Sequence, residues 1–314
     1  NIGTVSHEFF HSWNVERIRP ADLEPFDFTA ANMSGSLWFA EGFTSYHTNL
    51  ILARAGIITS EDYVKGLNRT FNYVWNSPAR DYFNPIEMSY QAPFVDAATS
   101  VDPVNRNNTF ISYYSYGSVL GLALDLSLRQ QGLNLDDYFK AVWNQFGKKE
   151  VSYSIQDLEN VLSGYAGDAF AKAFFSQYIY DSKMPDYQNL LSNAGLTITQ
   201  DKNKPYLGLR VNASESGLRI ASPTSKGSPA YVAKLNKGDL ITAVDGAAIT
   251  TVDAYNELVK KLTVGQTIAV TYKRFGNEAT TNLTVSADPT YTIATDENAG
   301  KKARKLKKYW LQEK

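Results

Sequence analysis

Two of the three histidines of this chain fall in one short run, His7-Glu8-Phe9-Phe10-His11. Residues four apart lie above one another on a helix, so this spacing predicts that both imidazoles lie on one side and converge on a single cation. Glu8 would project beside that cation, within reach of a water bound to it. A catalytic zinc site uses three protein ligands and leaves a fourth position to water, so the chain must supply one more ligand.

The third ligand must be a histidine or a carboxylate, because the chain contains no cysteine. Apolar residues recur at helical spacing after Ser34 and Ser36, either of which could cap a helix that ends near Gly56. This predicted helix carries both Glu41 and His47. The two residues lie six apart on different faces, so they cannot readily point at the same ion. We predict Glu41 as the ligand and His47 as a solvent-facing or hydrogen-bonded helix residue.

Metal-bound histidines are usually oriented by hydrogen bonds from neighbouring groups. Asn14, Thr44 and Ser45 are close in sequence to the predicted ligands and are candidates for this role. The same residue types also cap helices and bond to nearby backbone, and the sequence does not separate these alternatives.

The stretch from His7 to Pro20, with Trp13-Asn14 and Arg17-Ile18-Arg19-Pro20, is followed by Trp38-Phe39-Ala40-Glu41-Gly42. These motifs closely resemble the M61 peptidases, the glycyl aminopeptidase family, over roughly the first 190 residues. The resemblance implies a gluzincin that binds Zn²⁺ through His7, His11 and Glu41 and uses Glu8 as general base. It also implies an aminopeptidase that favours small N-terminal residues such as glycine or alanine.

The resemblance further implies a tyrosine that stabilises the transition state, placed just before a leucine-rich helix. The chain has Tyr113-Tyr114-Ser115-Tyr116-Gly117 at this point, and Tyr114 takes the catalytic position. Tyr116 stands where the family pattern has lysine. The alternative is that these tyrosines only form an aromatic-rich helix start.

The length of the chain predicts two domains, and the resemblance implies an α+β multidomain protein with a mainly helical zincin-type catalytic domain, followed by a small β-rich domain. The chain has 314 residues, of which 43% are hydrophobic, and a net charge of −1. No global field favours nucleic acid, and no apolar run is long enough to span a membrane. We predict a catalytic domain over residues 1–195, a second domain over 196–290 and a basic tail over 291–314.

Helices in the first domain are predicted at 113–130, 135–146, from the Ser154/Asp157 capping box to about 164, and at 168–180. Between Asn76 and Thr109, four prolines punctuate a polar stretch that we interpret as a long ordered loop bordering the cleft. The resemblance places a β-rich region before the zinc helix. We therefore expect that the chain is a fragment that lacks activity on its own, and we favour an exported or periplasmic protein because the region that would carry a signal precedes this segment.

The second domain resembles a PDZ domain over about 90 residues, from Tyr206-Leu207-Gly208-Leu209 through Gly238-Asp239-Leu240-Ile241 and Val244-Asp245-Gly246. Backbone amides at Leu207, Gly208 and Leu209 could bind the terminal carboxylate of a peptide. A helix over 252–262, which carries Leu258, would form the other wall. Alternatively, Tyr206 fills the groove and the domain only packs on the first one.

The basic run Lys301–Lys308 is interpreted as a solvated terminus, with an anionic surface as a possible ligand and Tyr309-Trp310-Leu311 as residues that could dock on the protein. Two function classes remain. The first is a zinc peptidase that acts on peptides or proteins, with a PDZ-like module that binds C-terminal peptides. The second is a noncatalytic adaptor with a peptidase-like core. The intact set of ligands and base favours the enzyme.

Overall fold

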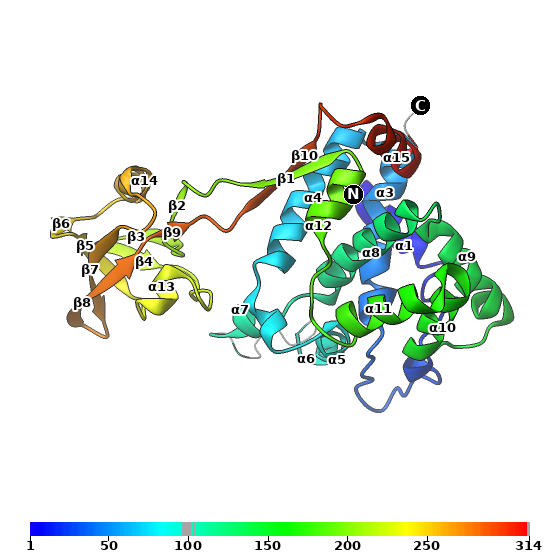
Figure 1. Cartoon of the computed structure of the whole chain (residues 1–314). Helices are drawn as coiled ribbons and strands as arrows, with labels where there is room; N and C mark the ends of the chain where they lie inside the picture. Colours follow the sequence, from blue (N-terminus) through cyan, green and yellow to red (C-terminus); the bar gives the residue numbers. More distant parts are fainter. Residues whose placement is uncertain (96–101, 103, 313–314) are drawn as a thin grey trace.

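The computed structural model describes residues 1–95, 102 and 104–312. It shows a helical domain joined to a small β-rich domain, as expected (Figure 1). The helices of the first domain are α1 (Ile2–Phe10), α2 (Leu37–Ala40), α3 (Gly42–Arg54), α4 (Ser60–Trp75), α5 (Pro85–Tyr90), α6 (Ala92–Val95), α7 (Arg106–Thr109), α8 (Tyr113–Gln130), α9 (Leu135–Gln145), α10 (Ile155–Ala166), α11 (Asp168–Tyr178) and α12 (Tyr187–Asn193). Short 3₁₀ turns are η1 (Ala21–Leu23), η2 (Pro78–Asp81) and η3 (Gly147–Lys149).

Several helices begin at capping residues. The Ser154 hydroxyl accepts a hydrogen bond from the Asp157 amide, and the Asp157 carboxylate accepts one from the Ser154 amide. α10 therefore begins with the predicted capping box. α8 has the predicted bounds, and it passes through the centre of the domain, where Leu120, Ala123 and Leu124 are buried. α8 therefore provides the surface on which the helices of the site pack.

The second domain contains β3 (Val211–Ser214), β4 (Gly217–Ile220), α13 (Pro229–Val232), β5 (Leu240–Val244), β6 (Ala247–Ala248), α14 (Val252–Lys261), β7 (Thr267–Arg274) and β8 (Asn277–Thr284). Its antiparallel sheet has the order β3-β4-β5-β7-β8, with β6 paired to β5. Ile268, Val270 and Tyr272 alternate into its own core, which is separate from the core of the helical domain.

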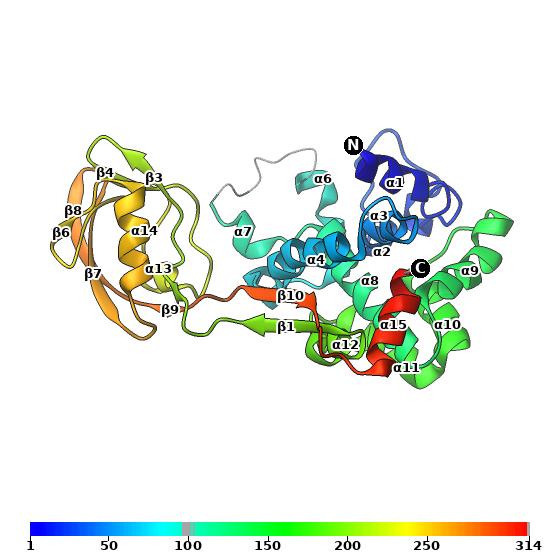
Figure 2. The same ribbon diagram turned by 90° about the horizontal axis from the view of Figure 1, so that it is seen from above.

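Two antiparallel strand pairs connect the domains (Figure 2). β1 (Leu196–Gln200) pairs with β10 (Tyr291–Thr295), and β2 (Pro205–Tyr206) pairs with β9 (Ser286–Ala287). On α4, the side-chain amides of Asn68 and Asn72 each form two hydrogen bonds with the backbone of β10, at 2.7–2.9 Å. β1 and β10 thus belong to the helical domain, and the β-rich domain is inserted between them. The predicted domain boundaries at residues 195 and 290 therefore place β1 in the β-rich domain and β10 in the tail, whereas both strands pack in the core of the helical domain.

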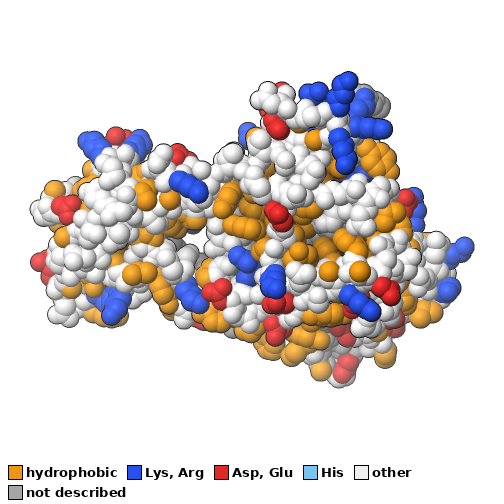
Figure 3. Space-filling view, viewed as in Figure 1, with side chains coloured by type: hydrophobic (Ala, Val, Ile, Leu, Met, Phe, Trp, Pro, Cys, Tyr) orange, Lys and Arg blue, Asp and Glu red, His pale blue; other side chains and the backbone are white. Residues whose placement is uncertain are grey.

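The C-terminal segment is not a solvated tail, contrary to the interpretation from sequence. It forms α15 (Lys301–Leu311), which returns to the helical domain. The Trp310 side chain is fully buried, and its indole N–H donates to the Tyr46 hydroxyl at 2.9 Å. Lysine and arginine side chains gather on the outer surface of this helix (Figure 3). Trp310 and Leu311 therefore dock α15 on the helical domain, while Tyr309 and the basic run lie on its exposed face.

The stretch from Asn76 to Thr109 also differs from the predicted loop. Its described residues form η2, α5, α6 and α7, because Pro78 and Pro85 occupy first-turn positions where proline suits a helix start. Residues 96–101 and 103 lie outside the described part. At α7, the Asn108 side chain donates to Thr224 O at 3.1 Å and accepts from the Lys226 amide at 2.8 Å, which ties the two domains together. None of the helices in the described residues is long and apolar enough to cross a membrane.

Candidate metal centre

The structure brings together the three predicted ligands. The Nε2 atoms of His7 and His11 lie 3.1 Å apart, and each lies 3.2 Å from Oε2 of Glu41. Atoms bound to one tetrahedral zinc ion at about 2.0–2.1 Å lie about 3.3–3.4 Å from one another. The triangle of potential ligand atoms therefore has nearly the dimensions that a shared ion requires, and it is the one such group among the described residues.

Hydrogen bonds on the far side of each ring fix the histidine tautomers. His11 Nδ1 lies 2.7 Å from the carbonyl oxygen of Asn14, so this nitrogen must donate. His7 Nδ1 lies 3.2 Å from the Thr48 hydroxyl, which itself donates to Thr44 O and must therefore accept from His7. Both Nε2 atoms then carry lone pairs and face a carboxylate. Three electron-rich atoms at this distance repel one another unless a cation lies between them, so the donor set fits a divalent metal.

The titration behaviour of the cluster agrees with this assignment. Burial by itself raises the pKa of Glu41, but hydrogen bonds with His11 and His7 outweigh burial and lower the pKa to about 2. The hydrogen bond to Glu41 raises the pKa of His11, against the opposing effect of burial. Without a metal, a shared proton thus takes the place of the positive charge. Metal binding would release that proton, which is the usual coupling for histidine ligands.

Glu41 lies at a break between α2 and α3, where the sequence predicts one continuous helix. Asn14 causes part of this break, because its buried side-chain amide donates to Phe39 O and Ala40 O, each at 3.1 Å. These carbonyls are thereby satisfied without regular helical partners. Asn14 also holds His11 through its backbone oxygen. One residue of the loop after α1 therefore positions two of the three ligands.

Two glycines allow the break to lie against α8. A Cβ atom added at Gly117 would overlap the carbonyl oxygen of Trp38, and one added at Gly42 would overlap the backbone of Gly117. Only glycine permits this close approach of the two backbones. The crossing brings the first turn of α8, which carries Tyr114, alongside α1, and the rings of His7 and Tyr114 stack with centroids 6.0 Å apart.

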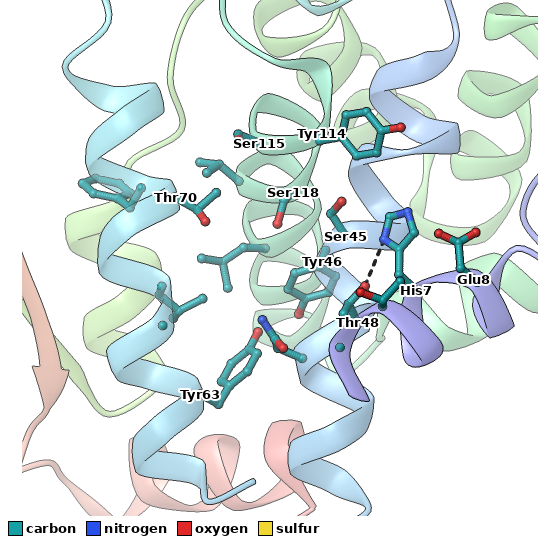
Figure 4. A pocket seen from close by; sticks show the side chains of 18 residues that line it. His7, Glu8, Ser45, Tyr46, Thr48, Tyr63, Thr70, Tyr114, Ser115 and Ser118 are labelled. Atoms are coloured by element: carbon teal, nitrogen blue, oxygen red, sulfur yellow. Dashed lines mark hydrogen bonds between the residues drawn. The ribbon is translucent and has the colours of Figure 1, made fainter. Parts of the chain in front are cut away.

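A cavity of about 530 Å³ opens beside the cluster, between α1, α3, α4 and α8 (Figure 4). We call it the metal-side cavity, and it is lined by Gly3, Thr4, His7, Glu8, Ser45, Tyr46, Thr48, Asn49, Tyr63, Gly66, Leu67, Thr70, Phe71, Tyr114, Ser115, Ser118, Val119 and Leu122. Glu8 and Tyr114, the two predicted catalytic residues, both reach it. None of the described residues of the 76–109 stretch lines this cavity, so the prediction that the stretch borders the cleft is not met there.

His47 lies outside the cluster. It is 2% exposed, its Nδ1 bonds to Phe43 O at 2.8 Å, and its ring stacks on Phe10 with centroids 4.5 Å apart. Burial lowers the pKa of His47 and favours its neutral form. The structure thus selects the hydrogen-bonded alternative for this residue. Tyr116, which replaces the expected lysine, is fully buried in the core of the domain.

Thr48 is the residue that sequence reasoning missed. Of the three candidates for a supporting role, Asn14 holds His11 and the helix break, Thr44 bonds to Ala40 O, and Ser45 lines the cavity. Thr48 follows Glu41 by seven residues, two turns along the same helical face. That spacing is the signal that could have identified it as the partner of His7.

The β-rich domain has its own cavity of about 540 Å³ between the predicted loop and α14. Leu207, Gly208 and Leu209 all line it, and so does Tyr206, which does not close it. Gly208 has φ +74°, and a Cβ there would lie 2.6 Å from Cβ of Ser228, so this turn requires glycine. Leu258, which was predicted to form part of the groove, does not line this cavity. Its side chain packs on the domain core, and the lining residues on α14 are Tyr255, Asn256, Val259 and Lys260.

A helical domain with a His-His-Glu cluster beside a cavity, carrying an inserted β-rich module with an open groove, defines a peptidase-type architecture with a peptide-binding domain. Comparison with family models supports this class. The M61 glycyl aminopeptidase model matches residues 1–120, and the PDZ domain model matches residues 205–285. The chain therefore contains an M61 peptidase region, matched over residues 1–120, and a PDZ domain, matched over residues 205–285.

Among solved structures, an aminopeptidase N family protein from Idiomarina loihiensis is 26% identical and superposes with a TM-score of 0.85. The match covers 99% of this chain and 54% of that protein, so the chain spans about half the length of this relative. Two further structures match smaller parts of the chain. A serine endoprotease from Yersinia pestis is 24% identical over 27% of this chain and 30% of that chain, with a TM-score of 0.25. The HtrA3 PDZ domain bound to a phage-derived ligand is 14% identical over 32% of this chain and 93% of that chain, with a TM-score of 0.24. No protein of curated function matches the chain.

Proposed function

We propose that the chain forms the catalytic part of a zinc-dependent aminopeptidase that favours small N-terminal residues such as glycine or alanine. The observation that carries the proposal is the triangle of His7, His11 and Glu41, with both histidines held in the tautomer that presents Nε2. An adaptor without metal would have no use for three mutually repelling donor atoms at this distance. The preference for glycine or alanine follows from the family.

Zinc at this position would supply a Lewis acid and lower the pKa of a bound water to about 7. Glu8 lies on the same helix as the histidines and reaches the metal-side cavity, so it can accept a proton and return it to the departing amine. The Tyr114 hydroxyl would donate a hydrogen bond to the carbonyl oxygen as negative charge develops there. Thr48 and Asn14 would hold the orientation of the His7 and His11 imidazoles during these steps.

Metal analysis and hydrolysis of glycyl and alanyl reporters by the full-length protein test this function. Glu8→Gln should retain zinc and lose activity by about 10²–10⁴-fold, the range for general acid–base groups. His11→Ala should lose the metal. Glu61→Gln, which changes an exposed glutamate at the start of α4, is the matched control and should change neither. Hydrolysis by Glu8→Gln at the parent rate would show that Glu8 is not the base.

We also propose that the PDZ domain binds the C-terminus of a peptide or protein. The backbone amides of Gly208 and Leu209 have no acceptor among the described residues and border the open groove. Such amides suit a terminal carboxylate. Fluorescence titration with C-terminal peptides and with the same peptides as carboxamides tests this role. The carboxylates should bind and the amides should not, and equal binding or none would favour a packing role for the domain.

A further inference from the structure

The metal-side cavity extends well beyond the groups that the proposed chemistry uses. His7, Glu8 and Tyr114 lie at one end, and the cavity continues between α4 and α8 as far as Tyr63 and Thr70 (Figure 4). Its volume of about 530 Å³ lies within the range of sites that hold a complete small ligand. An N-terminal glycine or alanine side chain would leave most of this space unfilled. The inner part of the cavity is therefore available to another part of the substrate.

Four hydroxyl groups on the wall have no protein partner. Ser45, Thr70, Ser115 and Ser118 all line the cavity, and none of their side chains forms a hydrogen bond with another described residue. Serine and threonine in helices commonly bond back to the carbonyl four residues earlier. Thr44 and Thr48 do so on α3, the helix that also carries Ser45. The hydroxyls of Ser45, Thr70, Ser115 and Ser118 can therefore form hydrogen bonds with a polar group that enters the cavity.

The charge of the wall limits what can enter. Among the described lining residues there is no lysine or arginine, and Glu8 is the one acid. A charged group removed from water without a partner is strongly disfavoured. A carboxylate would also meet Glu8. A cationic side chain could reach Glu8 only at the end where the scissile bond lies, so the inner part favours uncharged groups.

Apolar side chains on the same helices complete the wall. Leu67 and Phe71 contribute from α4, and Val119 and Leu122 contribute from α8. Apolar walls with a few polar groups are typical of pockets that hold an aromatic or large aliphatic group and fix its orientation. The combination of size, neutrality, apolar walls and free hydroxyls matches a large uncharged side chain with a polar tip.

We propose that the metal-side cavity selects the second residue of the substrate and accepts a large uncharged side chain with a hydroxyl, of which tyrosine is the type. The inference rests on the proposed function, because a small first residue leaves this space to its neighbour. Thr70 and Ser118 face one another across the cavity and would bond to the tyrosine hydroxyl (Figure 4). Gly66 on α4 also lines the cavity, and a Cβ there meets nothing within 4 Å, so a larger side chain can be introduced at this position.

The test measures kcat/KM of the zinc-loaded full-length protein for alanyl-X amides, with X as glycine, phenylalanine, tyrosine, lysine or glutamate. Tyrosine should exceed glycine, lysine and glutamate by about tenfold or more, and it should exceed phenylalanine by a similar factor. Gly66→Phe should remove the advantage of tyrosine over glycine. Gly164→Phe, at an equally open helical position on α10, is the matched control and should keep it. Thr70→Val with Ser118→Ala should equalise tyrosine and phenylalanine.

The outcomes separate this inference from the function on which it rests. If alanyl reporters are cleaved but the second residue has no effect, or if Gly66→Phe keeps the tyrosine preference, the cavity assignment is wrong and the peptidase assignment stands. If no substrate is cleaved, calorimetry on zinc-loaded Glu8→Gln protein still decides the question. Alanyl-tyrosine amide should bind about tenfold more tightly than alanyl-glycine amide, and equal affinities would overturn the proposal.

Discussion

Gly117→Ala is the substitution that tests most sharply how the crossing of α8 over α2 positions the metal ligands. The added Cβ would overlap the Trp38 carbonyl oxygen, three residues before Glu41. This obstacle is backbone, so it cannot rotate away as a side chain could. Overpacking of this kind costs about 1–3 kcal/mol, and the rigid obstacle places Gly117→Ala at the upper end. The better helix propensity of alanine offsets about 0.5–1 kcal/mol, which leaves a net loss of about 2 kcal/mol.

Gly164→Ala provides the matched control, because Gly164 lies inside α10 with open space around its Cβ position. The same change should there stabilise the protein by about 0.5–1 kcal/mol. Thermal unfolding should lower Tm by about 4–8 °C for Gly117→Ala and raise it by about 1–4 °C for Gly164→Ala. Zinc affinity should fall in the first variant alone, since Glu41 moves with the Trp38 backbone. Equal Tm shifts of the same sign in both variants would refute the close-approach explanation.

Three further predictions concern the surroundings of the site. Thr48→Val removes the acceptor for His7 Nδ1 and should weaken zinc binding by about 10–100-fold in a chelator competition. Thr48→Ser should bind zinc as tightly as the parent. An unchanged affinity in Thr48→Val would argue against the assigned tautomer of His7. Burial alone raises the pKa of Asp136, but the hydrogen bond and charge of Arg54, together with the charges of His47 and Arg129, outweigh burial and lower the pKa below its usual value. The Asp136–Arg54 ion pair should therefore stabilise the fold above about pH 4 and lose its effect as the pH falls through the folded pKa. Urea unfolding across pH should show a flatter acid limb for Asp136→Asn, and an unaltered limb would contradict this role. Trp310→Ala should destabilise the helical domain by about 3–5 kcal/mol in urea unfolding, whereas Lys305→Ala on the exposed face of α15 should have little effect, and similar results for both would mean that α15 does not dock.

The metal ligands could be predicted from sequence because their signals are local or motif-based. The four-residue spacing of His7 and His11 already determines that they share a helical face. The bounds of α8 and α10 follow from the ends of apolar periodicity, and the start of α10 follows also from its capping box. The alternating pattern of Ile268, Val270 and Tyr272 likewise indicated β7.

The features that sequence did not reveal depend on contacts between distant residues. The break at Glu41 requires the Asn14 amide and the glycine at position 117, neither of which alters the helical pattern of residues 37–54. The pairing of β1 with β10 joins strands nearly a hundred residues apart. The sequence pattern therefore indicated where the chain enters the β-rich domain but not that it returns to the helical domain. The basic run at 301–308 indicated a solvated terminus, and the sequence did not decide for the alternative that Trp310 docks, because its burial depends on Tyr46 in a different helix.

The orientation of single side chains was the other limit. Leu258 and Val259 are both apolar and adjacent on α14, and the periodicity alone does not say which of them faces the groove. In the structure Tyr255 and Val259 line the cavity beside Leu207 and also contact the domain core, whereas Leu258 contacts the core without lining the cavity. A helix period can thus identify a buried face, while the division of that face between core and groove depends on the tertiary structure.

X-ray absorption at the zinc edge of the metal-loaded full-length protein tests the central claim most directly. The cluster predicts one zinc ion per chain with two imidazole nitrogens at about 2.0–2.1 Å and the remaining first-shell atoms oxygen. Glu41→Gln should alter the oxygen shell, and His11→Ala should remove the ion. Bound zinc that lacks imidazole ligands, or a spectrum unchanged in His11→Ala, would contradict a metal centre built from His7, His11 and Glu41.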